Sequence, residues 1–142
     1  MTYAADLELA LAMADAADAL SMRHYRSKDL VITTKPDATP VTEADHAVEK
    51  LLRETLGEQR PADAIVGEEF GGDANLPGRR WIVDPIDGTK NYLRGVPVWS
   101  TLIALVVDDE YVVGVVSAPA MGRRWWAVQG GGAWTREVNG NV

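Results

Sequence analysis

Apolar residues recur at helical spacing near the start of the chain. Between Asp6 and Tyr25 the sequence is rich in alanine and leucine, and Leu7, Leu11 and Ala14 follow one another at intervals of four and three residues. This spacing places them on one side of a helix, and alanine and leucine are strong helix formers. The stretch predicts one amphipathic helix packed on the core.

A second helix is predicted to begin after Thr42. Asp45 follows three positions later, so the two side chains can satisfy each other's backbone amides as in a capping box. Apolar residues then recur along one side of the segment until Gly57, which is expected to end the helix as a left-handed residue.

The rest of the chain alternates between β-rich runs and turn residues. The predicted strands are 30–35, 64–66, 81–83, 99–107, 111–117, 124–128 and 133–135. The connection Asp108-Asp109-Glu110 predicts a hairpin between two of them. We therefore expect an α+β fold, in which an antiparallel sheet carries the two helices on one face. At 142 residues, 1–142 should form a single domain.

Composition narrows the classes of function. The net charge of −7 argues against a nucleic-acid or anionic-membrane surface, and zero cysteines exclude thiolate nucleophiles and cysteine-bound metals. Two histidines make a histidine-rich metal site implausible. The chain shows no membrane-length apolar run and no signal sequence, so a cytoplasmic location is expected.

One stretch combines carboxylates with a turn and a helix start. An apolar strand ends near Asp84, where Pro85 cannot continue a sheet ladder. The turn is expected to bring the carboxylates of Asp84 and Asp87 and the carbonyl of Ile86 into one small space. Oxygen ligands of this kind are those that Mg²⁺ prefers, so the stretch predicts a magnesium site.

An anion site is predicted directly after these carboxylates. Gly88 and Thr89 place backbone N–H groups at a helix start, where hydrogen bonding and the helix dipole favour an anion. With Lys90 and Asn91, they form the predicted phosphate-binding segment. The alternative is an ordinary acidic turn, since Asp, Pro and Gly are common turn residues.

Two further positions carry carboxylates. Glu68 and Glu69 follow a short apolar strand, and adjacent strand residues point to opposite faces. Only one of them can therefore enter a given site directly.

Most tryptophans are expected to pack in the core or on the sheet (Trp81, Trp125, Trp126 and Trp134), whereas Trp99 is a candidate for lining a substrate pocket.

The segment D-P-I-D-G-T at residues 84–89 resembles the signature of the inositol monophosphatase family, whose members are magnesium-dependent phosphomonoesterases. The resemblance extends to K-P-D-A-T-P-V-T-E-A-D at 35–45, G-E-E-F-G at 67–71, V-G-V-V-S-A-P at 113–119 and G-G-G-A-W at 130–134. The haloacid dehalogenase motif D-x-D-G-T does not fit, because Pro85 stands where its nucleophilic aspartate would be.

The resemblance implies roles for individual residues. Glu68, Asp84, Asp87 and the Ile86 carbonyl would hold Mg²⁺, and Glu69 would lie behind them.

The same resemblance implies that Thr89, hydrogen-bonded to Asp45, orients the attacking water, which Glu68 helps to deprotonate. Lys35 and Asp37 match a loop that closes on the metal site.

Within the family the sequence is most similar to the histidinol-phosphate phosphatases. This similarity implies that the substrate is histidinol phosphate and that the protein acts in histidine biosynthesis. The alternative substrates are inositol-1-phosphate and a nucleotide 3′-phosphate. The alternative role is that of a non-catalytic interaction or structural domain. Family members are about twice as long, so we expect this chain to match the N-terminal half, to lack the C-terminal α/β domain, and to have little activity alone. The expected partners are a small phosphorylated metabolite and a second copy in a homodimer, with no nucleic acid or membrane.

Overall fold

The computed structural model describes residues 2–26, 32–34, 40–68, 71–72 and 77–137. Three predicted residues, Lys35, Asp37 and Glu69, lie outside them. In chain order the elements are α1 (Ala4–His24), β1 (Ile32–Thr34), β2 (Pro40–Thr42), α2 (Glu43–Gln59), β3 (Ala64–Gly67), β4 (Arg79–Asp87), α3 (Thr89–Leu93), β5 (Ser100–Val107), β6 (Glu110–Ala118), the 3-10 turn η1 (Pro119–Met121), β7 (Arg123–Val128) and β8 (Gly132–Glu137).

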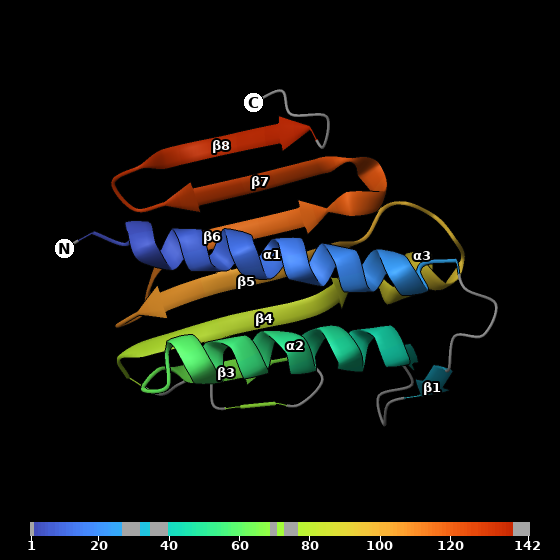
Figure 1. Cartoon of the computed structure of the whole chain (residues 1–142), viewed down its shortest axis with the longest axis horizontal. Helices are drawn as coiled ribbons and strands as arrows, with labels where there is room; N and C mark the ends of the chain where they lie inside the picture. Colours follow the sequence, from blue (N-terminus) through green and yellow to red (C-terminus); the bar gives the residue numbers. More distant parts are fainter. Residues whose placement is uncertain (1, 27–31, 35–39, 69–70, 73–76, 138–142) are drawn as a thin grey trace.

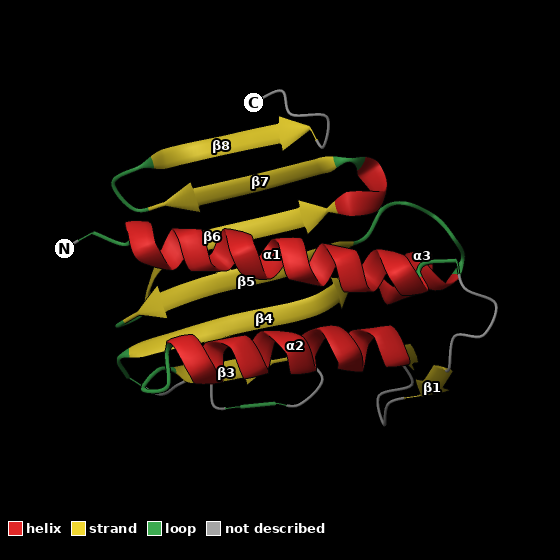
Figure 2. Cartoon of the chain, viewed as in Figure 1, coloured by secondary structure: helices red, strands yellow, loops and turns green. Residues whose placement is uncertain are grey.

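The described strands form one large sheet and one small one. The large sheet has the strand order β3-β4-β5-β6-β7-β8, and β1 pairs with β2 separately. Helices α1 and α2 lie side by side across one face of the large sheet (Figure 1, Figure 2). The predicted α+β architecture, with two helices on one face, is therefore confirmed.

Small side chains on α1 face the sheet. Ala10, Ala14 and Ala17 are completely buried, and Met13 is 2% exposed. They share one core cluster with apolar residues of α2 and of the central strands. Alanine allows the helix backbone to approach its neighbours closely, so this stretch, which has little polar–apolar contrast around the helix, still packs well.

Helix α2 starts as predicted. The Asp45 amide donates to the Thr42 hydroxyl at 3.2 Å, and the Asp45 carboxylate accepts the Thr42 amide at 2.7 Å. The capping box inferred from the spacing of these two residues is therefore confirmed.

The predicted end of α2 at Gly57 is wrong, because the helix continues to Gln59. Arg60, the C-cap residue that follows the helix, is fixed by a long-range contact, in which the guanidinium lies 3.0 Å from the carboxylate of Asp6 on α1. Pro61 follows, and the residue before a proline is disfavoured in helical conformation. The ion pair with α1 and the proline together set the boundary.

Two strand connections also differ from the prediction. Asp108 and Asp109 have positive φ angles of 48° and 70°, which is typical of the two-residue type I′ turn. The predicted three-residue connection is wrong, since Glu110 already pairs with Val107. The sheet is also not wholly antiparallel, because β3 pairs with β4 in parallel.

Strand β4 does not stop at Asp84, as Pro85 suggested, but continues to Asp87. Asp84 and Asp87, three positions apart, pair with β5 residues that are two positions apart, so β4 contains one extra residue as a β-bulge. A proline is tolerated at a bulge because its missing N–H breaks no regular ladder bond. The Thr101 hydroxyl donates to the Pro85 carbonyl at 2.8 Å across this bulge.

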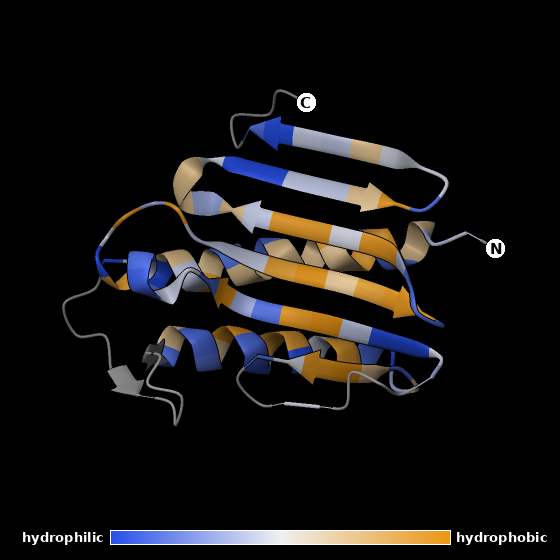
Figure 3. Cartoon of the chain, turned by 180° about the vertical axis from the view of Figure 1, so that it is seen from behind, coloured by the Kyte–Doolittle hydropathy of each residue, from blue (hydrophilic) through white to orange (hydrophobic). Residues whose placement is uncertain are grey.

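The opposite face of the sheet is covered by neither α1 nor α2, and in Figure 3, which views the chain from that side, many hydrophobic residues lie in the strands β4, β5 and β6. Trp81 points to the helices and is completely buried, as predicted. Trp125 and Trp134, however, are 38% and 53% exposed, so their assignment as packed residues is wrong. Trp125 is opposite Val116 on the uncovered face, whereas Trp134 is opposite Trp126 on the helix side. Strand β8 extends beyond α1 in Figure 1, so Trp134 has no helix above it. In the described residues, no helix has the length and apolar character needed to cross a membrane.

Candidate active site

Glu68 and Asp84 lie next to each other at the ends of two parallel strands. In the register of β3 and β4, Gly67 is opposite Val83, and the residues that follow these two are Glu68 and Asp84. The Glu68 amide donates to the Val83 carbonyl at 3.2 Å, which extends the pairing by one residue. Both acidic residues line the same hollow of about 340 Å³. The strand pairing thus brings together two of the predicted oxygen ligands.

Asp87 faces a neighbouring hollow. This second hollow, of about 390 Å³, is lined by Asp87, Gly88, Asn91 and Trp99 among others. Within the described residues, no three Asp, Glu, His or Cys side chains are close enough to share one metal ion. The predicted ions need only two carboxylates each, Glu68 with Asp84 and Asp84 with Asp87. The bulge places Asp84 and Asp87 opposite Leu102 and Ser100, two positions apart on β5, so both face the same side of the sheet.

The two hollows adjoin on the uncovered face of the sheet. Asp84 pairs with Leu102 on β5, Leu102 with Val116 on β6, and Val116 with Trp125 on β7. Leu102 lines the hollow of Asp84, whereas Val116 and Trp125 line the hollow of Asp87. The candidate site is therefore one acidic corner of an apolar surface.

Behind this corner, Asp45 and Thr89 are hydrogen-bonded. The Thr89 hydroxyl lies 3.0 Å from a carboxylate oxygen of Asp45 and 3.1 Å from the Ile86 carbonyl. Asp45 is completely buried, and its other carboxylate oxygen accepts both the amide and the hydroxyl of Thr42. The capping box of α2 thereby fixes the orientation of the carboxylate toward Thr89, and the hydrogen bond expected between these two residues is present.

The predicted phosphate-binding segment is divided between the hollow and the surface. Gly88 has a φ of +91°, and a Cβ there would lie 3.1 Å from the Val98 carbonyl, so only glycine fits without strain. The Asn91 side chain donates to the same carbonyl at 2.9 Å. Gly88 and Asn91 line the hollow of Asp87, whereas Lys90 is exposed on α3.

Three aromatic residues that were not predicted to act together support α3. Tyr25, Tyr92 and Trp99 form a cluster in which the ring centroids are 4.9 to 5.5 Å apart. Burial, followed by the negative charges of Asp45 and Glu43, raises the pKa of Tyr92. Tyr92 therefore stays protonated and donates its hydroxyl to the Ser21 carbonyl of α1 at 2.8 Å.

Sequence reasoning also missed an ion pair on α2, between the buried Glu49 and the half-buried Arg53. Arg53 donates from Nε to a carboxylate oxygen of Glu49 at 2.9 Å, and the Glu49 side chain has no exposed surface. A signal was available, because Asp45, Glu49 and Arg53 are spaced four residues apart and therefore share one face of a helix.

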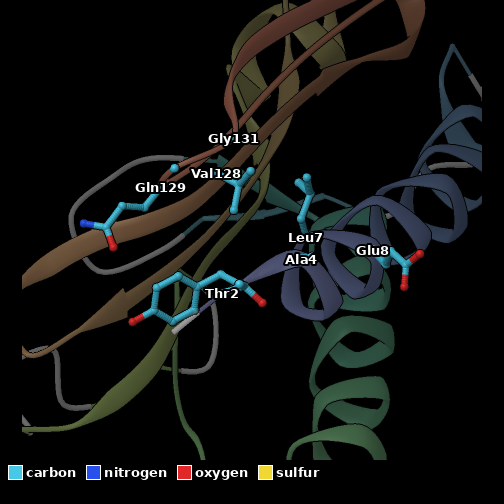
Figure 4. Close-up of a pocket in the computed structure, with 9 residues that line it drawn as sticks. Thr2, Ala4, Leu7, Glu8, Val128, Gln129 and Gly131 are labelled. Atoms are coloured by element: carbon cyan, nitrogen blue, oxygen red, sulfur yellow. The ribbon is translucent and has the colours of Figure 1, made fainter.

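A different hollow lies between the start of α1 and the turn after β7, and has a volume of about 430 Å³ (Figure 4). Its lining in the described chain includes one charged side chain, the carboxylate of Glu8, and no cationic group. This hollow offers nothing that would attract a phosphate, so the acidic corner remains the stronger candidate site.

Comparison with known proteins identifies the family of the chain. A model of the inositol monophosphatase family matches residues 3–142. The chain is 62% identical over 129 residues to a histidinol-phosphatase of Mycobacterium tuberculosis, covering 91% of this chain and 50% of that protein. It is 58% identical over 137 residues to a histidinol-phosphatase of Streptomyces coelicolor, covering 94% and 51%.

Solved structures give the same result for the fold. An IMPase of Thermotoga maritima superimposes with a TM-score of 0.85 at 30% identity, covering 92% of this chain and 51% of that one. The chain spans about half the length of the curated relatives it matches.

Proposed function

This chain belongs to the inositol monophosphatase family, and we propose that it supplies the metal- and water-binding half of a magnesium-dependent phosphomonoesterase. The observation that carries the proposal is the position of Glu68 beside Asp84 in one hollow. Family membership and the similarity to two histidinol-phosphatases support the assignment to phosphate-ester hydrolysis.

The donor groups at this corner suit magnesium. Glu68, Asp84 and the Ile86 carbonyl would hold one ion, and Asp87 would contribute to a second together with Asp84. All of these donors are oxygens, as a hard cation requires. The Ile86 carbonyl accepts at most one hydrogen bond from Thr89 and keeps a lone pair for a ligand. Magnesium bound there would stabilise the negative charge that develops on the phosphoryl oxygens during hydrolysis.

The hydroxyl of Thr89 would orient the attacking water. It has one proton, which it donates to Asp45 or to the Ile86 carbonyl, so its oxygen remains an acceptor for a water molecule. Glu68 would take a proton from that water as a general base. The backbone amides of Gly88 and Thr89, with Asn91 and Lys90 nearby, would hold the phosphate.

Histidinol phosphate is the proposed substrate, because both curated relatives described above are histidinol-phosphatases. This would place the protein in histidine biosynthesis. Inositol-1-phosphate and a nucleotide 3′-phosphate remain the alternative substrates. A cytoplasmic location remains a prediction from the sequence.

The proposal is tested most directly in a chimera that joins this chain to the second half of the M. tuberculosis histidinol-phosphatase. We expect magnesium-dependent release of phosphate from histidinol phosphate, faster than from the two alternative substrates. Asp84→Asn should lower the rate at least about 100-fold, since even residues that only support metal ligands affect activity 10- to 100-fold. An Asp84→Asn chimera with the rate of the unmutated chimera would disprove the assignment.

The uncovered sheet face supports a second candidate, a non-catalytic interaction domain. Val98 and Tyr111 are 56% and 73% exposed there, together with Trp125. Exposed apolar patches favour association, so the chain would form a homodimer regardless of magnesium. Light scattering measures the oligomeric state and calorimetric titration measures Mg²⁺ affinity, and only this candidate predicts a dimer that does not bind the metal.

A further inference from the structure

The pair formed by the buried Glu49 and the half-buried Arg53 lies against the backbone that leads into Glu68. Glu49 is completely buried, although carboxylates are rarely found without exposure. A Cβ added to Gly67 would lie 2.2 Å from one carboxylate oxygen of Glu49 and 2.6 Å from the other. The end of β3 is therefore in direct contact with this carboxylate, and only glycine leaves room for it.

Arg53 contacts the same segment of backbone from its other end. One guanidinium nitrogen pairs with Glu49, and a second donates to the Gly71 carbonyl. Gly71 is tied to Gly67 by two backbone hydrogen bonds, of 2.9 and 3.0 Å. The ion pair thus contacts both Gly67 and Gly71, on either side of Glu68 in the sequence.

Glu68 is held from the other side by β4. Its amide donates to the Val83 carbonyl, directly before Asp84. The backbone of Glu68 is therefore placed by two elements, the strand that carries Asp84 and the helix that carries Glu49. If the end of β3 at Gly67 moved away from α2, Glu68 would shift relative to Asp84, because Gly67 immediately precedes Glu68.

We propose that Glu49, acting through Arg53, is a positioning residue that holds Glu68 beside Asp84 in the geometry that magnesium binding requires. This inference rests on the function proposed above. A buried ion pair contributes little net stability compared with apolar residues of similar size. The pair of Glu49 and Arg53 instead contacts Gly67 and Gly71 and thereby restricts the position of Glu68. Groups that support metal ligands act in the same way.

The test compares two substitutions on the same helix. Glu49→Gln keeps the size of the side chain and removes its charge. Glu54→Gln is the matched control, since Glu54 also has a basic partner one turn away, Lys50 at 4.0 Å, but its side chain is 61% exposed. Arg53→Lys is a third variant, which keeps the charge but cannot contact Glu49 and Gly71 with a planar guanidinium.

Two measurements are made on each chain. Amide hydrogen exchange without metal, followed by NMR, reports the hydrogen bonds of Gly67, Glu68 and Gly71. Calorimetric titration with Mg²⁺ reports the affinity of the folded protein. We expect exchange at these three amides to be about tenfold faster in Glu49→Gln and in Arg53→Lys, and magnesium affinity to fall about tenfold or more. Glu54→Gln should change neither.

Each outcome decides the matter. Unchanged exchange at Glu68 in both variants overturns the proposal. A lower melting temperature with unchanged magnesium affinity also overturns it, because the pair would then only connect α2 to β3. If the unsubstituted chain binds no Mg²⁺, the proposed function fails at the metal site, and faster exchange at Glu68 still supports the positioning of this residue by Glu49.

Discussion

Replacing Asp45 by alanine should weaken the fold where α2 meets the candidate active site. The Asp45 carboxylate is completely buried and accepts the Thr42 amide at 2.7 Å, the Thr42 hydroxyl, and the Thr89 hydroxyl at 3.0 Å. Alanine removes all three acceptor contacts. Thr89 can still donate to the Ile86 carbonyl at 3.1 Å, whereas the Thr42 amide loses the acceptor recorded for it.

The expected magnitude follows from these contacts. The N-cap bond from the amide of residue 45 to the Thr42 hydroxyl survives. A lost buried hydrogen bond costs about 1 kcal/mol, and a buried donor left without an acceptor costs about 1–3 kcal/mol. Asp45→Ala should therefore lower the free energy of unfolding by about 2–4 kcal/mol. Asp45→Asn keeps one acceptor oxygen for Thr42 and should cost about 1 kcal/mol. Urea denaturation followed by tryptophan fluorescence measures both, with an unchanged m-value expected.

Glu43→Ala is the matched control, because Glu43 lies in the same first turn and is exposed. Its loss should cost no more than the helix-dipole term of about 0.3–1 kcal/mol. If Asp45→Ala were no more destabilising than Glu43→Ala, Asp45 would not be the shared acceptor for Thr42 and Thr89, and the account of how this carboxylate is oriented would be refuted.

Two further predictions concern the ion pairs that join α1 to the sheet. Arg124 has a side chain that is 8% exposed and lies 2.7 Å from Asp18, so Arg124→Met should destabilise the fold by about 3–5 kcal/mol. Its neighbour Arg123 pairs with Glu137 at the surface, and Arg123→Met should cost less than about 1 kcal/mol in the same thermal unfolding experiment; equal losses would contradict this assignment. Burial raises the pKa of Asp18 above 3.8, in spite of hydrogen bonds that lower it. The folded state therefore binds the proton more tightly than the unfolded state, and this contribution to stability is present below pH 3.8 and lost as the pH rises through the raised pKa. The stability difference between the unsubstituted chain and Asp18→Asn should accordingly fall over that interval, and a constant or increasing difference would show that the assigned direction is wrong.

Local sequence signals predicted the features that depend on neighbours in the chain. The capping box between Thr42 and Asp45 needs only a spacing of three residues, and α1 needs only apolar periodicity. Both are present. The hydrogen bond between Thr89 and Asp45 joins residues 44 positions apart, and it was expected only because of the family resemblance.

Features that depend on distant residues were missed or misplaced. Pro85 correctly indicated an irregularity in β4, but whether a strand ends or bulges depends on the partner strand, which supplies Thr101. The end of α2 depends on Asp6, 54 residues away from Arg60. Trp125 carries no mark of exposure in its own sequence, because exposure depends on which face of the sheet the helices cover.

Magnesium binding by the chain itself tests the central claim most directly. Calorimetric titration of the unsubstituted chain and of Asp84→Asn, with hydrogen exchange to verify that both are folded, requires no assumption about substrate. The account predicts weak, saturable binding by the unsubstituted chain and none by Asp84→Asn. Equal binding by the two chains, or no binding by either, would contradict the assignment of the corner formed by Glu68 and Asp84 as a magnesium site.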